Sequence, residues 1–216
     1  MPKLPSRPRE LSSRYRTAER HLSAAHPALA RVIETVGPCT LRPNSDLFHI
    51  LTQTVIAQQI STKAAMSIGR RFEEILGGNR RTAAAVLARS DEELRSAGLS
   101  GSKLRSIRAI AAAVADGTLN LRKLAKMPDA DVAAVLRAIK GLGPWSVDMV
   151  LIFGLGRLDI LPVGDLGFRF GVRDWLGLKD APTPQELEEL AEAWRPYRTI
   201  ATWYFWRSRG FVPQSD

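Results

Sequence analysis

The carboxylate of Asp165 is the group in this sequence best placed to do chemistry. It follows the apolar residues 160–163 and Gly164, and a helix containing Phe168 and Val172 is expected to begin directly after it. At a helix N-terminus the dipole favours the ionised carboxylate, while apolar surroundings oppose ionisation. A carboxylate held there could stabilise a positive charge that develops in a reaction. It could equally be an ordinary helix N-cap, worth about 1 kcal/mol of stability, and the residues alone favour this second interpretation.

A glycine turn precedes Asp165 by about twenty residues. In the segment 136–146 (LRAIKGLGPWS), an amphipathic helix is expected to end near Ile139, and Pro144 suits the first position of a new helix. Gly141 and Gly143 allow positive φ angles and leave room for a close approach. The free amides of the second helix would then point outward, which suits a phosphate diester. A tight helical corner with C-cap glycines and no ligand is the alternative, and both interpretations stay open at this point.

Helical periodicity indicates the elements that would position these groups. Apolar residues recur at i, i+3, i+4 and i+7 along most of the chain, and few segments alternate as strands do. Two capping boxes are expected, Ser90 with Glu93 and Thr183 with Glu186, and Pro184 suits the first position of a helix. We therefore predict an all-α fold of roughly ten short helices. The clearest stripes are Leu47, Ile50, Leu51 and Val55; Leu104, Ile107, Ala111 and Val114; Val132, Val135, Leu136 and Ile139; and Leu187, Leu190, Ala191 and Trp194.

The expected organisation is one helical domain built from two subdomains. Residues 1–20 carry three prolines and a basic surplus and are interpreted as a loose N-terminal arm, with the domain proper at 21–216. A central helical layer is expected at about 40–160, and a second layer from 21–39 together with 161–216. Helices are expected to stop at Gly78, Gly98, Gly117 and Gly141.

The charge balance indicates a polyanionic partner. The 216 residues include 31 Lys plus Arg and 22 Asp plus Glu, which gives a net charge of +9. Such an excess favours nucleic acid first and an anionic membrane second. A genome rich in arginine codons is the alternative explanation.

Several classes of protein are excluded by what the sequence lacks. A single cysteine, Cys39, excludes an internal disulfide and any cysteine-based iron–sulfur or zinc site within one chain. The three histidines lack metal-ligand spacing, and no zinc-deaminase signature occurs. No stretch approaches the roughly 18 apolar residues of a membrane span, and no secretory signal is visible. We expect a soluble intracellular protein without a cofactor.

Four motifs in order resemble one family. The glycine turn at 136–146 and the segment 161–167 (LPVGDLG) look like the hairpin and the Gly/Pro-rich loop with aspartate of the helix-hairpin-helix DNA glycosylase superfamily. Residues 58–61 (QQIS) and 194–198 (WRPYR) extend the resemblance, which covers about residues 47–209. Each motif alone is weak, but the combination is similar to the DNA-3-methyladenine glycosylase II branch in a compact form, without the extra N-terminal sheet domain that some members carry.

The resemblance implies a reaction centred on Asp165, the position of the family's catalytic aspartate. Cleavage of a glycosidic bond leaves an oxocarbenium-like sugar, which a fixed carboxylate stabilises. Alkylation at N3 of adenine or N7 of guanine makes the base cationic, so that it departs without a protonated acid. Gly164 stands where some members carry a second acidic residue, and one carboxylate can suffice. The implied activity is excision of alkylated purines in base excision repair.

The resemblance also implies that the enzyme does not cut the DNA strand. Bifunctional relatives carry a Schiff-base lysine in the hairpin, and Trp145 occupies that position here. Tryptophan cannot act as the nucleophile, and Lys140 lies in the turn on the other side of it. We expect simple hydrolysis without lyase activity.

A flipped base needs a pocket and leaves a gap in the duplex. The resemblance implies a base pocket formed by Trp145, Met149 and Trp206, where a cationic base could stack on aromatic faces; burial in the core is the alternative for both tryptophans. Gln59 matches the residue that the family inserts into the duplex, with an exposed glutamine before an N-cap as the alternative. The residues expected to contact DNA are Gln59, Ser61, Lys103, Lys140, Gly141, Leu142, Gly143 and Ser146.

The resemblance leaves two further expectations and two rivals. A monovalent cation could bridge the hairpin carbonyls, at Ile139 and Gly141, and the DNA phosphate. The expected partner is damaged double-stranded DNA, bound by a monomer in the bacterial nucleoid or the eukaryotic nucleus. The rivals are a non-enzymatic helix-hairpin-helix protein that only binds DNA, and a glycosylase for another class of lesion.

Overall fold

A computed structural model of the chain describes residues 8–78 and 81–210, and these residues form helices joined by turns and loops, without a strand. The all-α prediction is therefore confirmed. The helices fall into two compact units, one formed by residues 44–155 and the other by residues 1–43 with 156–216.

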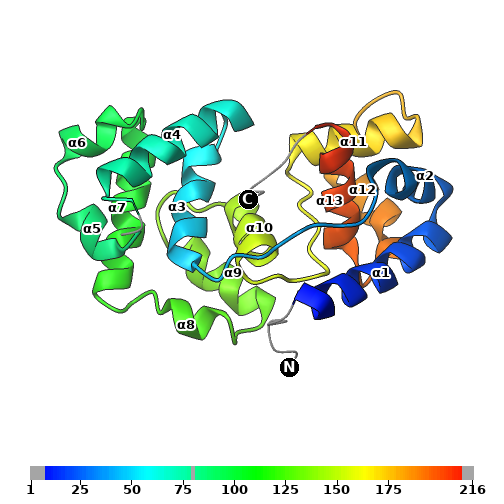
Figure 1. Cartoon of the computed structure of the whole chain (residues 1–216), viewed down its shortest axis with the longest axis horizontal. Helices are drawn as coiled ribbons and strands as arrows, with labels where there is room; N and C mark the ends of the chain where they lie inside the picture. The colour runs from blue at the N-terminus through cyan, green and yellow to red at the C-terminus, as the bar shows by residue number, and fades with distance from the viewer. Residues whose placement is uncertain (1–7, 79–80, 211–216) are drawn as a thin grey trace. The chain divides into compact units, whose positions relative to one another are not determined.

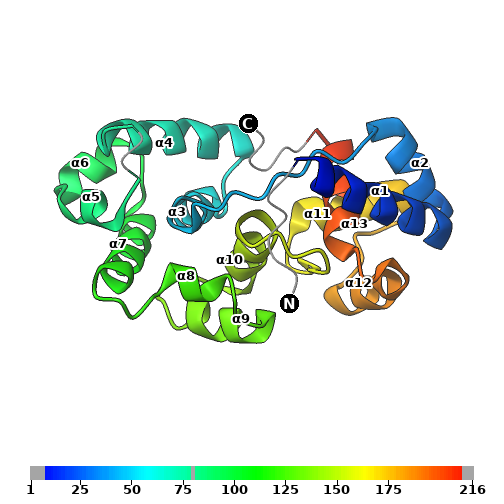
Figure 2. The ribbon, with the colours of Figure 1, turned by 60° about the horizontal axis from the view of Figure 1, so that its bottom comes forward.

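Helix α3 is the centre of the unit 44–155. It contacts α4, α7, α10 and the π-helical turn η1, and Figures 1 and 2 both show it beside α4, α7 and α10. Its predicted stripe, which begins at Leu47, is buried. Gly154 allows close packing here, since a Cβ at that position would lie 2.7 Å from Cδ2 of Leu47. The elements are α3 (Leu47–Ala57), α4 (Thr62–Ile75), α5 (Ala83–Leu87), α6 (Asp91–Ser96), α7 (Gly101–Ala115), α8 (Leu121–Leu124), α9 (Asp129–Arg137), α10 (Pro144–Met149) and η1 (Val150–Gly154).

Helix α13 is the corresponding centre of the other unit. Residues 199–206 are all buried, as expected of a helix covered on every side. It contacts α1, α2, α11 and the 3₁₀ turn η2. Gly171 lets α11 approach, because a Cβ there would lie 2.8 Å from the carbonyl oxygen of Phe205. The elements are α1 (Pro8–Ala25), α2 (Pro27–Val36), α11 (Leu166–Leu176), α12 (Pro184–Leu190), η2 (Ala191–Trp194) and α13 (Arg198–Ser208).

The interpretation of residues 1–20 as a loose arm is wrong for residues 8–20, which belong to α1. Tyr15, Ala18 and Leu22 recur at helical spacing and are almost fully buried. The hydroxyl of Tyr15 also donates a hydrogen bond to the carbonyl of Leu41 at 2.9 Å. Burial of this stripe holds the segment as a helix, and the prolines do not oppose it because Pro8 occupies the first helical residue. Residues 1–7 of the expected arm lie outside the described residues.

The local signals in the sequence are confirmed. Both capping boxes form, with Ser90 and Thr183 as N-caps and the glutamates three residues later bonding back. All four glycines expected to stop helices have positive φ angles. The estimate of roughly ten helices was too low because α5, α6 and α8 span only five, six and four residues. No described helix is both long and apolar enough to span a membrane.

Candidate active site

Asp165 is the N-cap of α11. Its backbone is extended, with φ −82° and ψ 112°, and its Oδ1 accepts a hydrogen bond from the amide of Phe168 at 2.7 Å. The expected N-cap geometry is thereby confirmed. The residue is only 8% exposed, which is unusual for a carboxylate that does nothing but cap a helix.

A second donor reaches the same oxygen from α13. Nε1 of Trp206 donates a hydrogen bond to Oδ1 of Asp165 at 2.9 Å. The tryptophan is 1% exposed, so this bond lies in a dry environment. Two donors on one oxygen fix the rotation of the carboxylate, which is the kind of preorganisation that charge stabilisation in a reaction requires.

The loop before Asp165 is held by its own backbone and by α13. The amide of Asp165 bonds to the carbonyl of Pro162 at 2.9 Å, and the amide of Ile160 bonds to Oγ1 of the buried Thr199 at 2.9 Å. Next to the aspartate, the side chain of Leu166 is 59% exposed. The chain that leads into residue 165 is therefore anchored by its own backbone and by Thr199 of α13.

Gly167 allows the close approach of Asp165 and Trp206. A Cβ at residue 167 would lie 3.3 Å from Oδ1 of Asp165 and 3.9 Å from Cδ1 of Trp206. Both side chains pack over this glycine, so a larger residue there would press on the carboxylate that the indole holds.

The glycine turn lies in the unit 44–155 and joins α9 to α10. Gly141 has φ +96°, and the amide of Leu142 bonds to the carbonyl of Ile139 at 3.1 Å. Gly143 is the N-cap of α10, Pro144 is its first residue, and α10 continues directly into η1. The helix-turn-helix geometry predicted for residues 136–146 is confirmed.

The turn rests directly on α7. A Cβ at Gly141 would lie 1.9 Å from Oγ of Ser106 and 2.6 Å from its Cβ. Position 141 therefore requires glycine for two reasons, the positive φ angle and the absence of space.

The loop that links α3 to α4 carries the predicted wedge residue. Gln59 is exposed and has φ +56°, and it is the only described residue other than glycine with a positive φ angle. A left-handed conformation costs such a residue about 1–2 kcal/mol, so its surroundings must hold it. Ser61 follows as the N-cap of α4, and its Oγ accepts a bond from the amide of Ala64.

The other predicted site residues have mixed environments. Lys103 donates from Nζ to the carbonyl of Ile56 at 2.7 Å, and burial lowers the pKa of its ammonium group. Lys140 is exposed, whereas Ser146 is 2% exposed. In α10, Trp145 is half-buried and Met149 is 5% exposed.

Sequence reasoning did not single out Gln58 within the QQIS motif. Its Nε2 donates to the carbonyl of Gly141 and to Oγ of Ser146, both at 2.9 Å. These partners are 83 and 88 residues away in the chain. The sequence alone carries no signal for such a long-range contact.

The described residues hold no group of three or more His, Cys, Asp or Glu side chains that could bind a metal ion. The two carbonyls expected to face a monovalent cation already accept hydrogen bonds, Ile139 from the amide of Leu142 and Gly141 from Gln58. A carbonyl oxygen can accept twice, and the cation stays a prediction.

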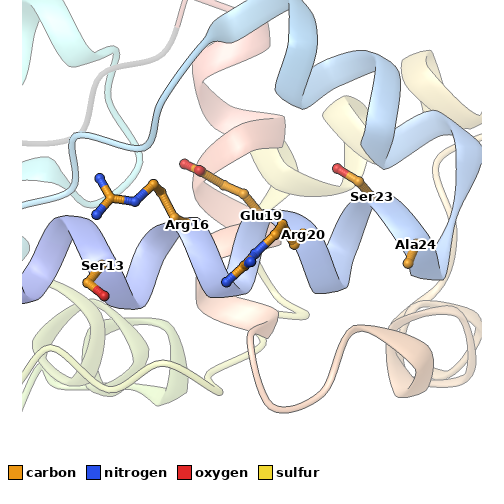
Figure 3. A pocket seen from close by; sticks show the side chains of 6 residues that line it. All are labelled: Ser13, Arg16, Glu19, Arg20, Ser23 and Ala24. Carbon is orange, nitrogen blue, oxygen red and sulfur yellow. The ribbon is translucent and has the colours of Figure 1, made fainter.

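A shallow pocket of about 720 Å³ lies along one face of α1 (Figure 3). Its charged residues are Arg16, Arg20 and Glu19, and the carboxylate of Glu19 accepts bonds from the amide of Cys39 and the hydroxyl of Tyr204. None of the residues predicted for the site lines it. The remaining lining residues are Ser13, Ser23 and Ala24.

Residues 52–196 match the HhH-GPD superfamily of base excision DNA repair proteins, and the chain belongs to this family. The alkylbase DNA glycosidase-like protein mag2 of Schizosaccharomyces pombe is 32% identical over 200 residues, covering 90% of this chain and 94% of the relative. DNA-3-methyladenine glycosylase 1 of the same yeast is 33% identical over 198 residues, covering 88% of this chain and 86% of the relative. The structure of the S. pombe 3-methyladenine DNA glycosylase Mag1 in complex with abasic DNA superposes with a TM-score of 0.83 at 31% identity, covering 93% of this chain and all of that one.

Proposed function

We propose that this protein is a monofunctional DNA glycosylase that releases alkylated purines, of the 3-methyladenine and 7-methylguanine type, from duplex DNA in base excision repair. The names of the two yeast relatives point to this substrate class. The observation that carries the proposal is the buried carboxylate of Asp165, which two donors hold through one oxygen.

The chemistry follows from that carboxylate. As the bond from C1′ to the base nitrogen breaks, positive charge develops on the sugar, and a fixed negative group beside C1′ lowers the energy of that state. The alkylated base already carries a positive charge, so it departs as a neutral molecule without a proton donor. Water then adds to C1′ and leaves an abasic site.

Extraction of the base needs a pocket and a plug. We propose that each of Trp145, Met149 and Trp206 contacts the flipped base, since a cationic base is attracted to aromatic faces and to a polarizable sulfur. Gln59 is the plug: it is exposed at the turn between α3 and α4, and its amide can hydrogen-bond the orphaned partner base. Trp206 can serve the pocket only through a limited part of its surface, because it is 1% exposed.

The hairpin residues 139–146 supply the contact with the strand. Neither glycine carries a side chain that would block the backbone, and we assign the phosphate to the N-terminal end of α10. Lys140 adds a positive charge in the turn, and Ser61 and Lys103 complete the proposed contact surface. The protein acts on double-stranded DNA as a monomer, and it works where the genome is kept.

The proposal includes the absence of strand cleavage. Trp145 occupies the hairpin position at which a Schiff-base lysine would have to stand, and tryptophan offers no nucleophile. Incubation with an abasic duplex and borohydride tests this directly. No covalent protein–DNA product is expected, and a trapped adduct would mean that another amine, for example that of Lys140, attacks the sugar.

The function itself is tested by incubating the protein with a panel of duplexes that each carry one lesion and measuring the free base by chromatography. Release of 3-methyladenine and 7-methylguanine is the expected result. Release of only oxidised or mismatched bases would assign another class of lesion. Binding to the duplexes without release of any base would leave a non-enzymatic DNA-binding protein and refute the proposal.

A further inference from the structure

We infer that Gln58 is a positioning residue that fixes the wedge loop to the proposed phosphate-binding hairpin. Insertion of Gln59 into the duplex and binding of the hairpin to the strand are thereby coupled. The wedge loop is residues 58–61 and the hairpin is residues 139–146. The inference rests on the proposed function, because it assumes that both segments contact DNA.

The first support is the geometry of the amide of Gln58. Its Nε2 carries two hydrogens, and each has an acceptor at 2.9 Å, one at the carbonyl of Gly141 and one at Oγ of Ser146. Gly141 is the turn of the hairpin and Ser146 lies in the first turn of α10. A single side chain therefore spans the turn and the helix that follows it.

The second support is the position of Gln58 in its own loop. It is the C-cap residue of α3, with φ −54° and ψ 128°, and it directly precedes Gln59 in its left-handed conformation. Anchoring the side chain of residue 58 fixes the point at which the chain turns outward, and so holds a strained neighbour that has little support from its own exposed side chain.

The third support is that α7 carries both segments. From one turn of α7, Nζ of Lys103 bonds to the carbonyl of Ile56 at the end of α3. From the next position along the same face, Ser106 fills the space beneath Gly141. Helix α7 thus supports both the wedge loop and the hairpin, and the side chain of Gln58 links the two segments directly.

The functional consequence is selective. If the two segments are locked, the binding energy of the hairpin on phosphates is transmitted to the insertion of Gln59. If Gln58 loses its donors, the hairpin still binds duplex DNA, but the plug inserts less well. The loss should therefore appear in the preference for a duplex that lacks one base over an intact duplex. The affinity for the intact duplex should stay the same.

The experiment compares Gln58→Met with the wild type on two probes, an intact duplex and the same duplex carrying a tetrahydrofuran abasic analogue next to 2-aminopurine. Methionine keeps the length of the side chain but donates no hydrogen bond. We expect the preference for the tetrahydrofuran duplex to fall about tenfold, in line with the loss of two hydrogen bonds. We also expect the 2-aminopurine signal of insertion to decrease, while affinity for intact duplex changes less than about twofold.

Gln53→Met is the matched control. Gln53 is on the same helix, and its amide donates to Glu73 at 3.1 Å, outside the two DNA-contacting segments. A similar loss of thermal stability with an unchanged preference is expected for this variant. If Gln58→Met does not fold, Gln58→Glu replaces it, because the ionised glutamate also offers no donor to the carbonyl of Gly141.

A wild-type preference and wild-type 2-aminopurine signal in folded Gln58→Met would overturn the inference. So would equal losses in Gln53→Met, or a wild-type protein that does not prefer the tetrahydrofuran duplex. None of these measurements requires release of a base. Failure of the proposed glycosylase activity is therefore distinguished from failure of the role inferred for Gln58.

Discussion

The indole of Trp206 donates a hydrogen bond to Oδ1 of Asp165 at 2.9 Å, and both side chains are almost fully buried. The aspartate caps α11 and the tryptophan lies near the end of α13, so the bond ties two packed helices together. Donors aimed at a buried carboxylate offset the cost of removing it from water. The tryptophan therefore contributes to the site through its N–H group as well as through its ring.

Replacement of Trp206 by phenylalanine should slow the chemical step more than it weakens DNA binding. Phenylalanine retains an aromatic face but has no N–H, and a hydrogen bond to a charged group is worth about 1.5–3 kcal/mol. If the full amount is lost in the transition state, base release under single-turnover conditions should fall about tenfold to 150-fold. Affinity for a tetrahydrofuran duplex should change less than about threefold.

Trp203→Phe is the control for this substitution. Trp203 is on the same helix, is 7% exposed and packs edge-on against Tyr204. Equal losses of base release in the two variants would show that the effect comes from packing in α13 and not from the bond to Asp165.

Substitution of Gly141 by alanine should weaken binding to all duplexes. The new Cβ would lie 1.9 Å from Oγ of Ser106 at a φ of +96°, so the turn has to move away from α7. We expect at least a tenfold loss of duplex affinity, which is about the value of one charge-assisted hydrogen bond to a phosphate. Fluorescence anisotropy with intact and damaged duplexes measures it.

Gly177→Ala separates the effect of the positive φ angle from that of the clash with Ser106. Gly177 also has a positive φ, +69°, but a Cβ there meets nothing within 4 Å. This variant should lose about 1–2 kcal/mol of unfolding free energy from backbone strain and bind DNA normally. Normal DNA binding by Gly141→Ala would show that the fit between turn and α7 is not required.

The sequence was sufficient to predict the local structure. Capping residues such as Ser90 and Thr183 act within one turn of chain, so their side chains and the amides they bond are visible as spacing. The same holds for Pro144 at the start of α10 and for Asp165 at the start of α11. The central layer was expected at about residues 40–160, and one compact unit of the structure spans residues 44–155.

The errors and omissions concern long-range contacts. Tyr15 bonds to Leu41, and α1 packs against α13 and η2 from the far end of the chain, so residues 8–20 of this helix were mistaken for an arm. The bond between Trp206 and Asp165 spans 41 residues, and that between Gln58 and Ser146 spans 88. Such pairs are fixed by packing, and no spacing rule reveals them.

Removal of the charge on Lys140 should change the salt dependence of binding. Each phosphate neutralised contributes about −0.9 to the slope of log K against log salt. Lys140→Ala should make that slope less steep by about 1 for intact and damaged duplexes alike, because a phosphate contact carries no sequence information. Lys179→Ala, which removes the same charge from an exposed residue of the loop after α11, is the control. An unchanged slope in Lys140→Ala would place this lysine away from the strand.

His49 should make the protein less stable at acid pH. Burial, followed by the positive charge of Arg81, lowers the pKa of this histidine below 6.5, although Glu73 and Asp46 act in the opposite direction. The folded state then binds fewer protons than the unfolded state, so unfolding free energy is lost as the pH falls from about 6.5 toward the lowered pKa. Urea unfolding between pH 7.5 and 5.5 should show a smaller loss for His49→Gln than for the wild type. An identical pH dependence of the two proteins would contradict this assignment.

The most direct test of the account is the rate of base release by Asp165→Asn. Asparagine is an equally good N-cap, and its oxygen can accept the same bonds from Phe168 and Trp206. The variant therefore removes the negative charge and leaves the surrounding structure in place. Single-turnover release of 7-methylguanine should fall at least about 100-fold, with affinity for a tetrahydrofuran duplex within about threefold of the wild type. Release at the wild-type rate would contradict the central claim that this carboxylate stabilises the departing sugar.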